Sequence, residues 1–297
     1  MINSKYRVVC DYDKTFTERV VFITGVGRSG TTILSQLIGS MAPVYYFDEP
    51  ILFNLIPLGP YLATVFYDDH AKKSVLKSLE KFKGNNGRWL WDIEGVPGPK
   101  NFSKQVYADT NMGAHDFISD VKPIFLVKLI NTQFYIDKYL ELFPGSTYVH
   151  IVRNGLNVIE SAANLGWYHH NLSARMVAGP FSEMVHAKND HNVPWYIPHE
   201  EVDIWAKSDM VTRLAHIWSV LVLKHEPSLA YEDLCKKPSK IAESMSKAFN
   251  IEMTDGTSRC IDDILKHRRQ NYPPLSLNDI GKPVREKFSS AMDKMGY

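Results

Sequence analysis

Cysteine is scarce in this chain. Its 297 residues hold three cysteines, Cys10, Cys235 and Cys260, which lie far apart in the sequence. An odd and scattered set argues against a disulfide framework and is typical of proteins in a reducing compartment. We therefore expect a cytoplasmic protein that is stabilised by a hydrophobic core rather than by covalent cross-links.

Long apolar runs and an excess of one charge are also lacking. No run approaches the roughly 18–20 apolar residues that a membrane-spanning helix needs, and residues 1–18 lack the apolar centre of a signal peptide. The formal net charge is +1, so no general positive field attracts nucleic acid or an anionic membrane. We expect neither a membrane span nor a nucleic-acid partner.

The most informative pattern lies near the N-terminus. The apolar, β-branched run Val20–Thr24 predicts a buried strand, and Gly25–Thr32 follows it directly with three glycines. The spacing of apolar residues after this turn is helical. A strand, a glycine turn and a helix N-terminus together bind anions, because free backbone N–H groups and the positive end of the helix point at the ligand. Arg28 and the hydroxyls of Thr31 and Thr32 add further donors, so a phosphate-bearing ligand is expected here.

Strand and helix patterns alternate along the rest of the chain. Strands are predicted at 44–47, 124–127, 147–152 and 228–231, and helices near 31–40, 71–82, 134–143, 155–165, 209–224, 238–249, 259–269 and 284–295. Such alternation predicts an α/β fold with a mostly parallel central sheet and helices on both faces. The length is sufficient for one such domain, and we expect a single domain over residues 1–297.

Residues 166–205 interrupt the alternation. They are rich in histidine, tryptophan, proline and asparagine, and a long insertion of this kind is usually functional, often as a lid. The histidine spacing fits no compact metal motif, so we expect a polar lid over the site. Two interpretations of its aromatic residues stay open: a platform for a ring-shaped ligand, or core packing. The aromatic residues are Trp167, Tyr168, Trp195, Tyr196 and Trp205.

Several polar residues follow predicted strands. Glu49, Lys128, Arg153 and the glycine turn all lie where a strand ends. Ligands bind beyond the carboxyl ends of the strands in parallel sheets. We therefore expect these residues to share one site, although Glu49 could instead cap a turn before Pro50 and Lys128 could be a solvated strand end.

The glycine turn has more than one interpretation. Gly25, Gly27 and Gly30 satisfy G-x-G-x-x-G, and with Asp48 after the second strand they fit a nicotinamide-dependent oxidoreductase. The same stretch has P-loop spacing, but Thr31 stands in place of the lysine that a nucleotide kinase requires. A third interpretation uses Arg28 to bind a 5′ phosphate without a metal ion. A non-catalytic nucleotide-binding protein is also possible.

A second junction helps to choose between these interpretations. Arg153 ends an apolar strand, and Ser161 lies eight residues later on the following helix. An arginine and a hydroxyl at such a junction can bind one phosphate, the arginine through two hydrogen bonds. A ligand with phosphates at two ends would then reach both Arg28 and Arg153.

These motifs resemble the sulfotransferases that use 3′-phosphoadenosine 5′-phosphosulfate (PAPS). Residues 25–32 look like the phosphosulfate loop of that family, and residues 149–161 look like its 3′-phosphate motif. Residues 231–234, with Pro238 after them, resemble a third segment whose tyrosine lies by the adenine. The resemblance implies a P-loop-like α/β fold and transfer of a sulfuryl group from PAPS, which leaves adenosine 3′,5′-bisphosphate (PAP). It implies no metal ion.

The resemblance also implies roles for individual residues. Arg28, Glu49 and Lys128 would be catalytic. The donor would be bound by Gly27, Arg28, Ser29, Gly30, Thr31, Thr32, Arg153, Ser161 and Tyr231. The acceptor would be a hydroxyl, or less readily an amine, of a small molecule, a carbohydrate or a peptide.

Departures from the family pattern suggest a branch. The small-molecule cytosolic branch has a histidine just after the lysine of the third strand, but residues 129–131 are Leu, Ile and Asn. Carbohydrate, tyrosyl-protein and bacterial branches place a glutamate shortly after the loop, and Asp48-Glu49-Pro50 resembles that placement. Glu49 is therefore the expected general base, with Asp48 as the alternative. Gly155 stands where the family usually has proline, which leaves the start of the following helix uncertain.

Overall fold

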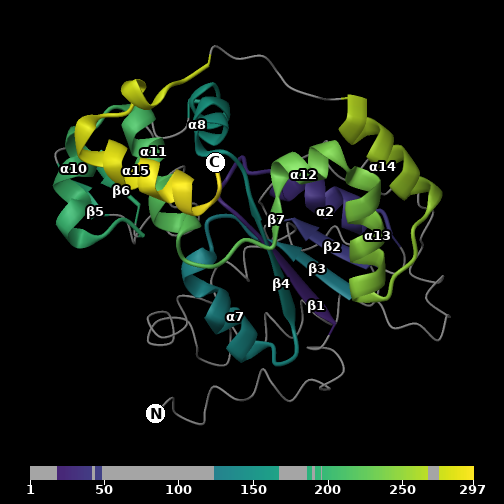
Figure 1. The fold of residues 1–297 in the computed structure, drawn as a ribbon. Helices are drawn as coiled ribbons and strands as arrows, with labels where there is room; N and C mark the ends of the chain where they lie inside the picture. Colours follow the sequence, from purple (N-terminus) through teal and green to yellow (C-terminus); the bar gives the residue numbers. More distant parts are fainter. Residues whose placement is uncertain are drawn as a thin grey trace, which may run out of the picture. The chain divides into compact units, whose positions relative to one another are not determined.

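The chain is described here from a computed structural model, which covers residues 19–41, 44–48, 124–166, 186–188, 191–194, 196–266 and 274–297. Two compact units are present (Figure 1). The first unit contains the described residues that fall within 19–24, 31–149 and 233–266, and the second contains those within 25–30, 150–232 and 274–297. The single domain expected over 1–297 stays a prediction, and the helix expected near 71–82 lies outside the described residues.

The first unit is built on parallel strands. β3 (Ile124–Lys128) pairs on one side with β1 (Val20–Thr24) and on the other with β2 (Val44–Asp48). β4 (Thr147–Val152) follows β1 in the sheet order β2-β3-β1-β4-β7. Every residue of β1 is buried, as expected for a parallel strand covered on both faces. The register sets Asp48 beside Lys128 at the carboxyl ends of their strands.

Helices cover these strands on either side (Figure 1). The Phe22 ring of β1 lies 5.1 Å from the ring of Tyr139 and 5.7 Å from that of Phe143, which binds the strand to α7. α2 contacts β2 and β3, and it also contacts α13 and α14. Helices in the described part of this unit include α2 (Thr31–Gly39), η3 (Gln133–Tyr135), α7 (Ile136–Leu142), α13 (Pro238–Phe249) and α14 (Asp255–Lys266).

The second unit contains the end of β4 and a bundle of helices. β7 (Leu229–Ala230) runs parallel to the last residues of β4. The predicted strand at 228–231 is one residue too long at each end. Tyr231 begins α12 (Tyr231–Lys236), which continues into the first unit. α11 (Met210–Val222) is buried almost throughout and contacts both α8 (Gly155–Ala163) and α15 (Lys282–Lys294).

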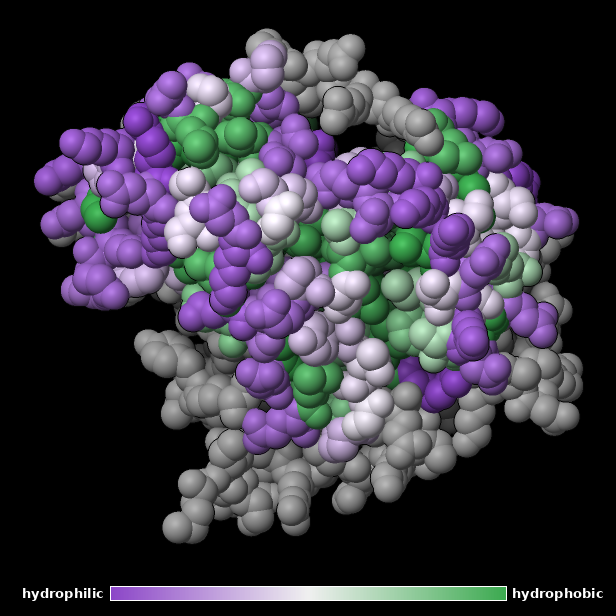
Figure 2. Space-filling view, viewed as in Figure 1, coloured by the Kyte–Doolittle hydropathy of each residue, from purple (hydrophilic) through white to green (hydrophobic). Residues whose placement is uncertain are grey.

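The described part of 166–205 contains regular structure. β5 (His186–Lys188) and β6 (His191–Val193) form an antiparallel pair, and η5 (His199–Glu201) and α10 (Val202–Lys207) follow. Tyr196 and Trp205 are buried, so they serve the core and not an exposed platform. Figure 2 shows mostly hydrophilic residues on the side of this unit that carries α10.

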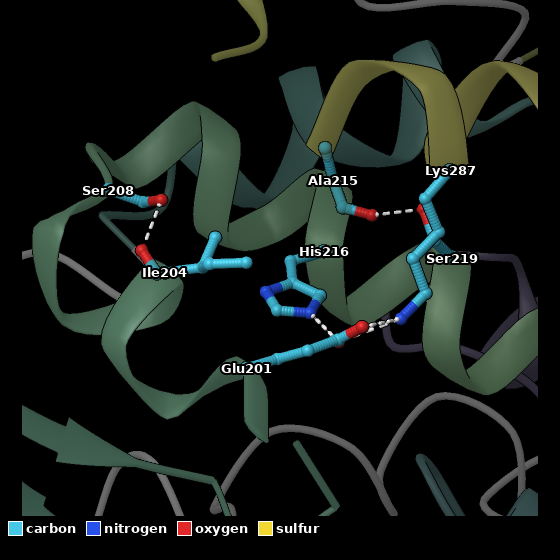
Figure 3. A network of polar contacts seen from close by, with 7 residues as sticks. All are labelled: Glu201, Ile204, Ser208, Ala215, His216, Ser219 and Lys287. Atoms are coloured by element: carbon cyan, nitrogen blue, oxygen red, sulfur yellow. Dashed lines mark hydrogen bonds and ion pairs between the residues drawn. The ribbon is translucent and has the colours of Figure 1, made fainter. Parts of the chain in front are cut away.

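A polar network joins three elements of the second unit (Figure 3). The Glu201 carboxylate accepts hydrogen bonds from Nε2 of His216 at 2.5 Å and from Nζ of Lys287 at 2.7 Å. Burial lowers the pKa of His216 despite the nearby carboxylate, so the imidazole is neutral and donates. Burial raises the pKa of Glu201, but the hydrogen bonds from Lys287 and His216 outweigh it and lower the pKa overall. The network ties η5 to α11 and α15.

No helix in the described ranges has the length and apolar character that crossing a membrane requires.

Candidate functional site

The glycine turn after β1 is tightly folded. The amide N–H of Ser29 donates to the carbonyl of Val26 at 3.0 Å. Arg28 has φ 74° and Gly30 has φ 95°. Both residues therefore adopt the left-handed region, which residues other than glycine rarely occupy. Such backbone strain at a non-glycine residue is concentrated at functional sites. The strained backbone leaves the Arg28 side chain exposed while Ser29 is buried.

The structure brings Arg28, Arg153 and Ser161 together in the second unit. Nε of Arg28 donates to Oγ of Ser161 at 3.0 Å, and Nη1 of Arg153 donates to the backbone carbonyl of Arg28 at 3.1 Å. Arg153 follows β4 directly, and Ser161 lies on the buried face of α8. Two arginines that are linked through the backbone of Arg28 suit a ligand with more than one negative charge.

Tyr231 lies between the glycine turn and Arg153. The guanidinium carbon of Arg153 is 4.7 Å from the centre of the Tyr231 ring, within the range of a cation–π interaction. A Cβ atom added to Gly30 would lie 2.3 Å from Cδ2 of the same ring. Glycine is therefore required at position 30 both for its positive φ and for the space that Tyr231 fills.

Protein groups already occupy the N-terminus of α8. The amide of Asn154 donates to Oε1 of Glu232 at 3.1 Å, and the amide of Gly155 donates to Sδ of Met292 at 3.2 Å. The amide of Asn157 donates to the side chain of Asn154, which is the N-cap residue. An anion bound beside α8 would therefore depend on side chains of the cluster more than on these three amides.

Packing against α15 accounts for the glycine at the start of α8. α8 begins at Gly155. A Cβ atom at position 155 would lie 2.7 Å from Cζ of Phe288 and 2.9 Å from Sδ of Met292. Glycine replaces the usual proline because α15 packs against this position too closely for a larger residue.

A second set of polar groups lies in the first unit. Lys128 is 4% exposed, and its Nζ donates to Oγ1 of Thr32 at 3.1 Å. Oγ1 of Thr24 and Oγ1 of Thr132 are 2.9 Å apart. Gln133 is fully buried, and neither its amide nitrogen nor its amide oxygen has a hydrogen-bond partner in the described part of the chain. Lys128 thus places a buried cation at the carboxyl end of β3, the end of a parallel strand at which ligands bind.

The predicted site residues are thus distributed over both units. Gly27, Arg28, Ser29, Gly30, Arg153, Ser161 and Tyr231 belong to the second unit, and Thr31, Thr32 and Lys128 belong to the first. Glu49 lies outside the described residues. Sequence reasoning missed Gln133, Glu232 and Met292. Of these three residues, Glu232 alone could have been identified from the sequence, because it follows Tyr231 in the motif at residues 231–234. Among the side chains that the structure describes, no group of three or more His, Cys, Asp or Glu residues could hold a metal ion.

A model of the sulfotransferase family matches residues 20–255. The chain belongs to the sulfotransferase family. The resemblance seen in the sequence is confirmed, and so is the α/β class with its mostly parallel sheet. This sulfotransferase is therefore an enzyme of sulfuryl transfer, and the oxidoreductase and kinase interpretations of the glycine turn are set aside. α15 and Tyr297 lie beyond the matched residues.

Two solved structures are similar to this sulfotransferase. Sulfotransferase STF9 from Mycobacterium avium is 13% identical, with a TM-score of 0.46 over 98% of this chain and 80% of that one. Sulfotransferase STF1 from Mycobacterium tuberculosis H37Rv is 16% identical, with a TM-score of 0.40 over 96% of this chain and 80% of that one. A search of curated protein sequences finds no match.

Proposed function

We propose that this sulfotransferase moves the sulfuryl group of PAPS to an acceptor hydroxyl, or less readily to an amine, without a metal ion. The observation that carries the proposal is the meeting of two arginines from different strand–helix junctions. Arg28 of the glycine turn bonds to Ser161, and Arg153 bonds to the backbone of Arg28. A doubly phosphorylated adenosine supplies the charge that this pair of guanidinium groups requires.

The second unit would bind the nucleotide through its 3′ phosphate. Arg153 and Ser161 would hold this phosphate, and Tyr231, whose ring lies against the Arg153 guanidinium, would lie by the adenine. Binding energy from the 3′ phosphate, which does not react, would position the reacting sulfuryl group.

The glycine turn would bind the 5′ end of the donor. The turn runs without a break into α2, whose first residue is Thr31. The first N–H groups of a helix have no partner within the helix and readily bind phosphate oxygens. The amides at the N-terminus of α2, the Arg28 side chain and the hydroxyls of Thr31 and Thr32 would stabilise charge on the leaving 5′ phosphate.

Lys128 would act on the group in transfer. Its ammonium group is buried and is held by Thr32 at the carboxyl end of β3. A buried cation interacts with charge more strongly than one in water. Lys128 would neutralise the sulfuryl oxygens while the bond from sulfur to the 5′-phosphate oxygen breaks and the bond to the acceptor oxygen forms.

Glu49 would be the general base. It follows β2 directly, and the last residue of that strand, Asp48, lies in register with Lys128. A carboxylate placed one residue beyond this strand could take the proton of the acceptor hydroxyl as the oxygen attacks sulfur. The acceptor would be a small molecule, a carbohydrate or a peptide. Residues 166–205 would lie on the side of the site where the acceptor binds. The free thiols of Cys235 and Cys260 favour a cytoplasmic location.

The first test of the proposal is to find which nucleotide stabilises the folded protein. Thermal unfolding is recorded with PAP, NAD or ATP, each with and without magnesium. A ligand at about 100 times its Kd stabilises the folded state by about 2.7 kcal/mol, which corresponds to a rise of several degrees in Tm for a chain of this size. We expect that rise with PAP in the absence of magnesium. A response to NAD alone, or to ATP only with magnesium, would contradict the proposal.

A further inference from the structure

The carboxylate of Glu232 bridges two parts of the second unit that lie far apart in the sequence. Oε1 accepts the amide N–H of Asn154 at 3.1 Å, and Oε2 accepts the phenol of Tyr297 at 2.7 Å. Asn154 directly follows Arg153, and Glu232 directly follows Tyr231, whose ring lies against the Arg153 guanidinium. Glu232 therefore acts on Arg153 from two sides, through the backbone of one neighbour and the ring of the other.

α15 supports the same turn from a second direction. Sδ of Met292 accepts the amide N–H of Gly155, and the ring of Phe288 fills the space where a Cβ atom of Gly155 would lie. Phe288 is itself fully buried, with its ring 5.2 Å from that of Trp218 in α11. The backbone of residues 153–155 is thus held by a carboxylate and by a packed helix.

We propose that Glu232, held in place by Tyr297, is a positioning residue for the 3′-phosphate side of the donor site. Glu232 orients the backbone at Arg153 so that the guanidinium meets a 3′ phosphate, and it does not touch the ligand. The segment from α15 to Tyr297 then belongs to the nucleotide site of this chain, although it lies beyond the residues that the family model matches. The inference rests on the proposed function.

The charge of Glu232 favours positioning over simple stabilisation. An anion next to a phosphate site repels the ligand, so a carboxylate here is costly to binding unless both its oxygens are engaged elsewhere. The amide of Asn154 occupies one oxygen and the phenol of Tyr297 occupies the other. Both carboxylate oxygens are thus turned toward protein donors, so the carboxylate supports the backbone instead of facing the ligand.

The contacts of Arg153 explain why its position depends on this support. Its Nη1 bonds to a backbone carbonyl, and its Nε is buried without a hydrogen-bond partner among the described residues. The guanidinium is therefore oriented by one hydrogen bond to Arg28, by the Tyr231 ring and by its own backbone. A displacement of about 1 Å in a positioning group can reduce rates about 100-fold. Loss of the Glu232 bridge should therefore weaken the binding of the 3′ phosphate.

The test compares two nucleotides that differ only in the 3′ phosphate. Calorimetry gives the Kd of PAP and of adenosine 5′-monophosphate for the wild type, Tyr297→Phe and Glu232→Gln. We expect the preference for PAP, the ratio of the two Kd values, to fall by roughly 5- to 10-fold in each variant. Affinity for the monophosphate should stay near the wild-type value. Tyr297→Phe removes one hydroxyl and keeps the test valid if Glu232→Gln does not fold.

A matched control separates positioning from general loosening of α15. Lys287→Met removes the bond from α15 to Glu201 but none of the contacts to residues 153–155. It should lower Tm and leave the preference for PAP unchanged. The inference is overturned if Tyr297→Phe lowers Tm without changing that preference, or if Lys287→Met changes it equally. A wild type that binds both nucleotides equally would show that the proposed donor itself is wrong, and the inference would fail with it.

Discussion

Nε of Arg28 lies 3.0 Å from Oγ of Ser161, although 133 residues separate them in the sequence. The contact joins the strained glycine turn to the buried face of α8. An arginine that is already fixed by a protein hydroxyl loses less side-chain freedom when a ligand binds. The pair therefore pre-organises one cation of the proposed donor site.

Ser161→Ala should weaken PAP binding. The variant removes a hydrogen bond to a charged group, which is worth about 1.5–3 kcal/mol, so we expect the Kd of PAP to rise at least about 10-fold. Ser219→Ala is the matched control, because the hydroxyl of Ser219 donates to the Ala215 carbonyl within α11, away from Arg28 and Arg153 in the hydrogen bonds of the described residues. Calorimetry with PAP gives both values. An unchanged Kd in Ser161→Ala would show that this hydroxyl does not support the site.

Gly155→Ala should destabilise the fold. The new Cβ atom would lie within 3 Å of Phe288 and Met292, and overpacking of this kind costs about 1–3 kcal/mol. Phe288→Leu creates space, so the double variant should lose less stability than the two single variants added together. Urea unfolding of the four proteins measures the coupling. Strictly additive losses would mean that the clash is relieved in another way.

Stability should fall as the pH drops below neutrality, because of His150. Burial, more than the opposing hydrogen bonds to the backbone of His225 and Glu226, lowers the pKa of His150 to about 4. The unfolded chain binds a proton near pH 6.5 but the native state does not, so the neutral histidine's contribution is complete above pH 6.5 and is lost as the pH falls towards 4. The full effect is about 3 kcal/mol.

His150→Asn tests this dependence, since asparagine can still donate to the His225 carbonyl but does not titrate. The free energy of unfolding is measured at pH 7 and at pH 4.5 for both proteins. The variant should lose less stability between the two values than the wild type. Part of the dependence should remain, because burial also lowers the pKa of His216. Equal losses would show that His150 does not cause the effect.

Glu49→Gln should reduce turnover and spare donor binding. General-base assistance is worth about 10²–10⁴-fold in rate, whereas a carboxylate that acts on the acceptor adds nothing to PAP affinity. Transfer from radiolabelled PAPS to a panel of acceptors measures the rate, and calorimetry measures the affinity. Asp48→Asn is the control. If Asp48→Asn loses turnover and Glu49→Gln retains it, the base is Asp48.

Local sequence was sufficient for the fold class, the family and the glycine turn. Buried parallel strands are apolar runs, helices repeat their apolar residues every three to four positions, and tight turns need glycine, so each feature is encoded over a few neighbouring residues. Boundaries were less accurate where the signal is weak. α14 begins at Asp255 and not near residue 259, because its first turn is almost entirely polar.

Long-range packing decided the rest. No local pattern marks Met292 and Glu232 as the acceptors for the α8 amides, or Gly155 as the residue against which α15 packs. These contacts join residues that lie 78 and 137 positions apart. Helix packing sets such pairings through shape and burial, which leave no periodic trace in the chain. The residues proposed to bind phosphate can therefore be identified from their neighbours in sequence, while the groups that orient them appear only once the helices are packed.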